Sequence, residues 1–390
     1  MILPLGDAPN PRGVPVVTYF LLAANIAVYL LVTVPLSSTA PNPRDPRLQE
    51  YVRAVKHNLP ENVSPQRLAE QVSAYDLVVF EYGFRPAHPS LTALFTALFL
   101  HAGFMHLFGN MLFLWIYGDN VEHRLGALRY LTAYIVAGVA ASSFYGVFDS
   151  DSPLPLIGAS GAISGVLGCY FIWFPHNRVR MFVFFFPFMM DTVFVRARLV
   201  LGAYLLLDNV LPYVGSRGGG GVAYGAHIGG FLAGLMIALI ANRREVAATP
   251  SEFATTETAP ETSLITDLRE AVGRGRYDDA AKMYFSLSPN ATRGALSGGD
   301  LLQLADWLET AGHHQAALVA YRRLLRDEPN GPLRSEAHVG AGRLLLTQGE
   351  QPAAYQHFLD ALEGNPSVQV ERAARQALEQ INARSPLRRR

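Results

Sequence analysis

The chain has 390 residues, of which half are hydrophobic and 16% are charged, and its mean hydropathy is +0.17. Soluble domains carry nearer a quarter charged residues, so a membrane-embedded portion is expected. The 32 basic and 32 acidic side chains cancel, so no nucleic acid or other polyanionic partner is implied. The single cysteine, Cys169, excludes an intrachain disulfide and a multi-cysteine metal site.

Six apolar segments dominate the first 245 residues. About 20 apolar residues span the hydrocarbon core of a bilayer. The sequence therefore predicts an all-α domain over residues 1–245, a bundle of six membrane spans with a long polar loop at about residues 37–90. The stretch RMFVFFFPFMMD is expected to be a re-entrant or interfacial piece. The expected spans are Val14–Leu36, Phe104–Tyr117, Leu131–Phe148, Ile157–Phe174, Leu199–Val214 and Val222–Ala241.

Arginine residues orient this bundle. They lie in the connections between spans two and three and between spans four and five, and after span six. Cytoplasmic loops carry an excess of Lys and Arg, so these three connections and both termini are expected to be cytoplasmic. The long first loop and the glycine-rich loop Gly215–Gly221 then face the opposite side. The protein is accordingly expected to be a multi-pass membrane protein. The general style of the sequence, and not the charge pattern, is the basis for expecting a bacterial plasma membrane.

The composition changes after the last span. Residues 246–263 are rich in Thr, Ala, Pro and Glu and are expected to form a disordered linker. Residues 264–390 contain a helical repeat whose units begin at Gly275, Gly312 and Gly349, 37 residues apart. Each unit has an alanine five residues after its glycine and an aromatic residue nine after it. These positions are Ala280, Ala317 and Ala354, and Tyr284, Tyr321 and Phe358.

This repeat resembles a tetratricopeptide array, although the usual period there is about 34 residues. The alternative is a generic helical bundle. Arrays of this kind bind peptides or proteins, so a cytoplasmic protein or peptide partner is expected for this domain.

Span four carries a stripe of small residues. Gly158, Gly161, Gly165 and Gly168 share one helical face, and Ser160 lies at its edge. Small residues let helix backbones approach closely in lipid, so the stripe alone predicts only packing.

Span six adds a second stripe with an ionisable residue. His227, Gly230 and Gly234 follow one face, and an ionisable residue inside a span is a functional candidate. The alternative is a histidine satisfied by a neighbouring hydroxyl. If the two glycine faces pack together, Ser160 Oγ and His227 come within hydrogen-bond reach, as a nucleophile and its general base.

Span two contributes polar side chains near its start. His106 and Asn110 are four residues apart and share a face, where they could donate hydrogen bonds to a developing oxyanion. His101 is off this face and is expected at the helix mouth. The alternative is a polar cluster that caps the helix or binds a water.

With these motifs in order, residues 14–242 resemble the rhomboid family of intramembrane serine proteases. The motifs are FLHAGFMHLFGNMLFLWIYGDNVE, GASGA and GAHIGGFLAG. The resemblance implies hydrolysis of peptide bonds in or near transmembrane segments of substrate proteins, without metal or cofactor. The active site would open to the non-cytoplasmic side of the bilayer.

The resemblance also assigns roles to residues. It implies a dyad of Ser160 and His227 without an acidic third member. It implies an oxyanion hole made by His106, Asn110 and the backbone N–H of Ser160, with Gly158 allowing the entering loop to approach. The loop Gly215–Gly221 is hypothesised to be a lid.

The sequence departs from the family pattern at two places. Ser164 stands where many members have an aromatic residue that packs on the histidine, and the Trp-Arg pair of the first loop is absent.

Two alternative functions are also considered. One alternative is a catalytically silent rhomboid-like scaffold that binds membrane clients. The other is a transporter, suggested by intramembrane polar residues such as Asp208.

Overall fold

A computed structural model describes residues 2–11, 13–56, 64–185, 189–215, 223–253, 261–363 and 366–384. The chain is mostly helical and divides into two compact units, each described here by itself. The first unit comprises Met1–Asp7, Gly13–Pro175 and Val179–Ala238, and the second comprises Ala8–Arg12, His176–Arg178 and Leu239–Arg390.

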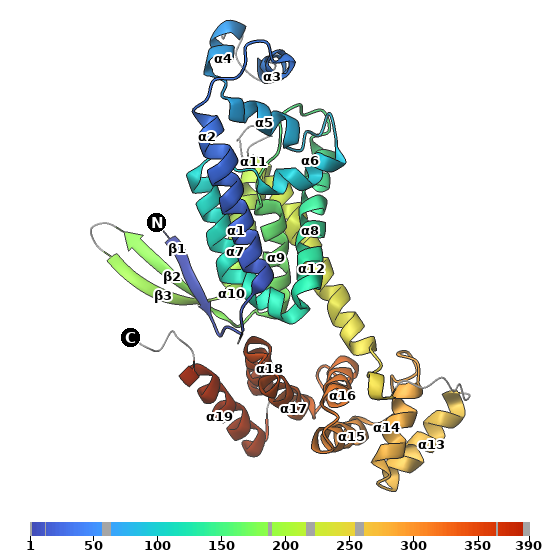
Figure 1. The fold of residues 1–390 in the computed structure, drawn as a ribbon. Helices are drawn as coiled ribbons and strands as arrows, with labels where there is room; N and C mark the ends of the chain where they lie inside the picture. The colour runs from blue at the N-terminus through green and yellow to red at the C-terminus, as the bar shows by residue number, and fades with distance from the viewer. Residues whose placement is uncertain are drawn as a thin grey trace. The chain divides into compact units, whose positions relative to one another are not determined.

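Six helical stretches lie where the apolar segments were expected (Figure 1). Two are interrupted by a π-helical turn, so that each consists of three consecutive pieces. They are α1 (Val16–Val28) with η1 (Tyr29–Thr33) and α2 (Val34–Ser37), α7 (Phe104–Leu125), α8 (Ala127–Phe148), α9 (Ser160–Trp173), α10 (Ala197–Leu205) with η3 (Leu206–Val210) and α11 (Leu211–Gly215), and α12 (Tyr224–Ala247).

Not all of these stretches are long enough to cross a bilayer. Four of the described helices are long and apolar enough, and a bent pair, Leu91–Phe99 with Phe104–Leu125, makes a fifth if it counts as one span. The two members of the pair meet at 89°. Helix α9 has 14 residues, which extend only about 21 Å against a hydrocarbon core of about 30 Å. The number of six spans therefore stays a prediction.

The polar region after the first helix contains short helices. They are α3 (Pro46–Lys56), α4 (Pro65–Gln71), α5 (Ala74–Tyr82), α6 (Leu91–Thr96) and the 3-10 turn η2 (Ala97–Phe99). Helix α5 begins with a capping box, in which Ser73 and Asp76 each accept from the other's backbone N–H. This cap fixes Tyr75 in the first turn of α5, and Tyr75 is a contact of the site described below.

A three-stranded sheet corrects the all-α prediction. Its strands are β1 (Ile2–Ala8), β2 (Arg178–Phe185) and β3 (Met189–Arg196), in the order β1-β2-β3. Part of RMFVFFFPFMMD, expected as a re-entrant or interfacial piece, thus lies in strands. In β2 the buried Val179 and Met181 alternate with the less buried arginines, which is the two-residue period of a strand.

A buried carboxylate ties α1 to α7. Glu122 of α7 accepts hydrogen bonds from the backbone N–H groups of Val17 and Thr18, at 2.9 and 2.7 Å, and from the Thr18 hydroxyl at 2.8 Å. The first N–H groups of a helix have no intrahelical acceptor, and the helix dipole there favours negative charge. Glu122 therefore fixes the start of α1 against α7, a neighbour of α9.

The second unit is made of helices joined in pairs by glycine turns. Gly275, Gly312 and Gly349 have φ of 71°, 88° and 85°, a region that favours glycine. The alanines and aromatic residues of the repeat are buried, with at most 1% of their surface exposed. The helices are α13 (Glu261–Gly273), α14 (Tyr277–Ser286), α15 (Gly298–Thr310), α16 (His314–Asp327), α17 (Arg334–Thr347), α18 (Gln351–Glu363) and α19 (Val368–Arg384).

The repeat thus forms helical pairs, while its membership of the tetratricopeptide class stays a prediction.

Part of the expected linker, the 3-10 turn η4 (Ser251–Phe253), has a defined structure. In this turn Phe253 is buried and stacks on Phe285, with ring centroids 5.2 Å apart.

Candidate active site

The site begins where the chain enters α9. Gly158 has φ of +122° and donates its backbone N–H to Ala97 O at 2.8 Å, and Ser160 is the first residue of the helix. A side chain at Gly158 would be strained by this φ and would also lie 2.8 Å from the imidazole of His106. Because the first N–H groups of a helix have no intrahelical acceptor, the backbone N–H of Ser160 is a donor at this end.

The glycines of α9 and α12 pack backbone against backbone. A Cβ added at Gly230 would overlap the carbonyl oxygen of Gly161, and one at Gly234 would overlap that of Gly165. A Cβ at Gly168 would likewise overlap the carbonyl oxygen of Phe231. Any larger residue at these positions would push the two helices apart.

This close approach brings a hydroxyl and an imidazole together. Ser160 Oγ lies 2.8 Å from His227 Nε2, and both residues are half-buried. The distance is that of a good hydrogen bond, so the imidazole can accept the hydroxyl proton if its Nε2 is unprotonated.

The other nitrogen of His227 contacts a residue that the sequence analysis did not single out. Asn209 Oδ1 lies 2.7 Å from His227 Nδ1, and Asn209 Nδ2 donates to Tyr204 O at 2.9 Å. The Tyr204 hydroxyl in turn lies 3.1 Å from Ser164 Oγ. The only signal in the sequence was a polar pair within an apolar segment, and of this pair Asp208 is exposed whereas Asn209 is buried.

The polar residues of α7 lie at the same end of α9. Atoms Cε1 and Nε2 of His106 lie 2.8 Å from the Cβ position at Gly158, and Ser160 Oγ lies 3.7 Å from that position. Asn110, one turn further along α7, is buried and its Nδ2 has no hydrogen-bond partner among the described residues. A buried donor without a partner is costly, which marks Asn110 as a group that could bind an incoming oxygen.

His101 was expected at the mouth of a helix. It lies in the break between η2 and α7 and is fully buried. Its backbone N–H donates to Tyr75 Oη at 3.0 Å, while that hydroxyl donates to His101 O at 2.9 Å. The rings of His101 and His106 are 5.1 Å apart. His101 therefore packs behind His106, held by the short helix α5.

The proposed lid and a group of potential metal ligands are two further candidates for a site. Six of the seven residues of the proposed lid, 216–221, are outside the described part of the chain. Within the described part, one group of His, Asp and Glu is close enough together to hold a metal ion, and it consists of His176, Asp360 and Glu363 of the second unit. None of these three is a predicted site residue.

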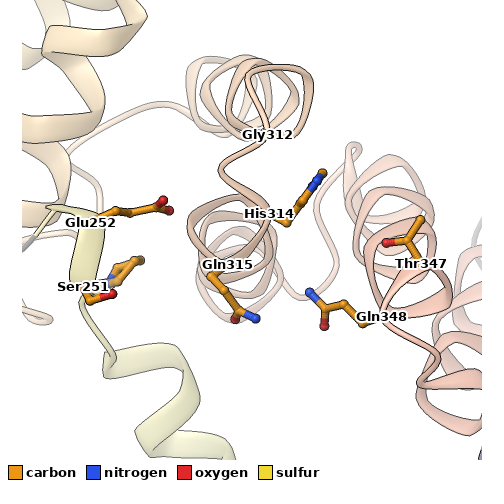
Figure 2. Close-up of a pocket in the computed structure, with 8 residues that line it drawn as sticks. Ser251, Glu252, Gly312, His314, Gln315, Thr347 and Gln348 are labelled. Atoms are coloured by element: carbon orange, nitrogen blue, oxygen red, sulfur yellow. The ribbon is translucent and has the colours of Figure 1, made fainter.

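The second unit also contains a cavity of about 530 Å³ (Figure 2). It is lined by the η4 turn and by the turns that precede α16 and follow α17, and Figure 2 shows Glu252 on one side and Gln348 on the other. Its lining residues are Pro250, Ser251, Glu252, Gly312, His314, Gln315, Thr347 and Gln348.

Part of the chain is similar to a known protein domain. Residues 88–244 match the rhomboid domain, and this region contains all the residues of the candidate active site. The match and the relatives below support the rhomboid family, whose members are generally intramembrane serine proteases, for this part of the chain. With the apolar helices, they support a multi-pass integral membrane protein.

Three relatives illustrate the similarity. The chain is 40% identical over 93 residues to Rhomboid protein 1, mitochondrial, of Saccharomyces cerevisiae, which covers 23% of this chain and 27% of that protein. It is 43% identical over 90 residues to Rhomboid protease GluP of Bacillus subtilis, and these residues make up 23% of this chain and 17% of that protein. It is 30% identical over 152 residues to RHOMBOID-like protein 7 of Arabidopsis thaliana, and these residues make up 38% of this chain and 42% of that protein. The chain thus spans less than half the length of each.

Proposed function

We propose that the protein is an intramembrane serine endopeptidase that uses Ser160 as nucleophile and His227 as general base. The observation that carries the proposal is the 2.8 Å contact between Ser160 Oγ and His227 Nε2 inside a region that matches the rhomboid domain. Its substrates are proteins with transmembrane segments, and with the six predicted spans and their predicted orientation the site would open to the non-cytoplasmic side. The second unit binds a cytoplasmic protein or peptide.

The reaction follows from the positions of these groups. Ser160 Oγ attacks the carbonyl carbon of the scissile peptide bond while His227 Nε2 takes the hydroxyl proton. The tetrahedral oxyanion accepts hydrogen bonds from the Ser160 N–H, Asn110 Nδ2 and His106. The protonated His227 then gives its proton to the leaving amine, which leaves an acyl-enzyme. A water, deprotonated by His227, hydrolyses the ester and regenerates Ser160.

Labelling with a fluorophosphonate tests this proposal. The purified full chain is expected to be labelled at Ser160, Ser160→Ala to lose the label, and His227→Ala to react about 100-fold or more slowly. Ser143→Ala is the matched control, because Ser143 is an exposed serine of α8, and it should react like the unmodified protein.

A cleavage assay distinguishes the protease hypothesis from the silent-scaffold hypothesis. Equal cleavage of a model transmembrane substrate by Ser160→Ala and by the unmodified protein would contradict the proposal. A folded protein that neither reacts with the probe nor cleaves would favour the scaffold.

A further inference from the structure

The imidazole of His227 is held from the side opposite Ser160. Its Nδ1 lies 2.7 Å from Asn209 Oδ1, while its Nε2 lies 2.8 Å from Ser160 Oγ. Asn209 is 1% exposed, so water cannot readily replace this contact. The family resemblance assigns no residue to this position, and the aromatic residue that would pack on the histidine is replaced by Ser164.

The partner of the Asn209 amide nitrogen decides which way the amide faces. Asn209 Nδ2 lies 2.9 Å from Tyr204 O, and a backbone carbonyl can only accept a hydrogen bond. The amide nitrogen must therefore face Tyr204, and the amide oxygen faces His227. An oxygen there accepts only from a protonated Nδ1, so a neutral His227 carries its proton on Nδ1 and keeps the lone pair of Nε2 for Ser160.

A π-helical turn puts Asn209 in this position. Residues Leu206–Val210 form the π-helical turn η3, and such turns occur frequently at functional sites. Asn209 is buried and contacts His227, whereas its neighbour Asp208 is exposed. The turn thus presents a neutral amide to the histidine and leaves the carboxylate outside.

The contacts continue back to α9. Tyr204 Oη lies 3.1 Å from Ser164 Oγ, and Ser164 is one helical turn after Ser160. The sequence of contacts Ser160, His227, Asn209, Tyr204 and Ser164 therefore starts and ends on α9. It fixes α10, which leads directly into η3, to the helix that carries the nucleophile, so Ser164 has a structural role at the position of the missing aromatic residue.

We infer that Asn209 is a positioning residue for His227. Asn209 selects the Nδ1–H form of the imidazole and holds Nε2 toward Ser160. This inference rests on the proposed function. A neutral amide does this without adding charge to the site, where His106 is a nearby ionisable group. Asn209 touches neither the substrate nor the reacting atoms, so its effect is exerted through His227.

The test combines a disruptive variant, a conservative variant and a neighbouring control. Asn209→Leu has a similar volume but cannot accept a hydrogen bond, and fluorophosphonate labelling of the full chain should slow about 100-fold. Asn209→Asp keeps the acceptor and should react within about 10-fold of the unmodified protein. Its carboxylate favours the protonated imidazole, so the midpoint of the labelling rate against pH should rise by about one pH unit or more. Asp208→Asn changes the exposed neighbour and should leave rate and midpoint unchanged.

A role in packing alone would give a different result. The inference is overturned if Asn209→Leu reacts at the unmodified rate, or if Asn209→Asp neither restores the rate nor moves the midpoint. The nitrogen chemical shifts of ¹⁵N-labelled histidine provide a readout that needs no reaction. They should show the Nδ1–H form for the signal lost in His227→Ala, and a shift toward the other form in Asn209→Leu.

The same spectra distinguish the two proposals. If Ser160 is not labelled but the Nδ1–H form is present and depends on Asn209, the proposed function fails and the positioning of His227 stands. If Ser160 is labelled and the Nε2–H form predominates, the positioning role fails and the protease survives.

Discussion

Helices α9 and α12 of the first unit and helices α16, α17 and α18 of the second pack by opposite means. Between α9 and α12 the contact is made by glycines, with carbonyl oxygens of one helix against the glycine Cα atoms of the other. In the second unit, the rings of Tyr321 and Phe358 fill the space over Gly340 and Gly342. The glycines thus make room for the backbone of a neighbouring helix in the first unit and for an aromatic ring in the second.

The difference follows from the solvent each unit is expected to meet. In lipid, apolar side chains gain little by leaving the solvent, so close packing and hydrogen bonds hold helices together. In water, burying an aromatic ring is itself strongly favourable. The first unit therefore allows Ser160 and His227, on different helices, to meet with little side-chain bulk between them, whereas the second unit forms its core from large side chains.

The largest effect should come from filling the glycine contact of the first unit. In Gly230→Val the new side chain would overlap Gly161 O and separate α9 from α12. Moving Nε2 of His227 out of hydrogen-bond range of Ser160 should slow fluorophosphonate labelling on the order of 1000-fold. Gly202→Ala is the control, since nothing lies within 4 Å of its added Cβ. Labelling of Gly230→Val at the unmodified rate would show that the close contact is not required.

The same contrast explains what the sequence could predict. The two glycine stripes, the helical register of His106 and Asn110, and the glycine turns of the repeat are local patterns that a single helix or turn determines. Their spacing indicated that Ser160 and His227 could come together if the two glycine faces packed, and Ser160 Oγ lies 2.8 Å from His227 Nε2.

Features that depend on distant parts of the chain were missed. The contact of Asn209 with His227 depends on a π-helical turn that moves Asp208 outward, and no spacing in LLDNV indicates that turn. Strand β1 pairs with β2, more than 160 residues later, so the polar, proline-rich start of the chain gave no sign of a sheet. His101 is buried because Tyr75 of α5 binds its backbone, another contact between separate segments.

The second prediction concerns a polar contact in the second unit, where a buried histidine can be titrated. Burial lowers the pKa of His338 on α17 to about 4 from its usual 6.5, and its Nδ1 lies 3.0 Å from His357 Nδ1 on α18. The unfolded chain binds this proton below pH 6.5 and the folded unit does not, so stability is lost as the pH falls from 6.5 to 4. The loss should reach about 3 kcal/mol.

Amide hydrogen exchange in α17 and α18 of the full chain, corrected for its intrinsic pH dependence, measures this loss. His338→Gln stays neutral and should flatten the pH dependence, whereas His314→Gln changes an exposed histidine and should retain it. A steep dependence in His338→Gln would assign the effect to another group.

The smallest effect is expected from the counterpart of Gly230 in the second unit. In Gly340→Val the added Cβ would lie 2.6 Å from Cε1 of Tyr321, so the ring must move away from hydrogen bonds to Asp306 Oδ1 (2.5 Å) and Glu309 Oε2 (2.8 Å). A ring can shift, whereas a carbonyl group of a packed helix cannot. The free energy of unfolding should therefore fall by the amount typical of overpacking, about 2 kcal/mol. Exchange in α16 and α17 should then accelerate about 30-fold.

Labelling at Ser160 should be retained in Gly340→Val, because the candidate active-site residues all belong to the first unit. Gly273→Val is the matched control, since its Cβ meets nothing within 4 Å. If Gly340→Val left exchange unchanged, the ring of Tyr321 would have to move without loss, and the second unit would be less tightly packed around its aromatic residues than its burial indicates. If it instead accelerated exchange far beyond 30-fold, the ring would be as immobile as the backbone contact of α9 and α12, and the contrast between yielding side chains and unyielding backbone would fail.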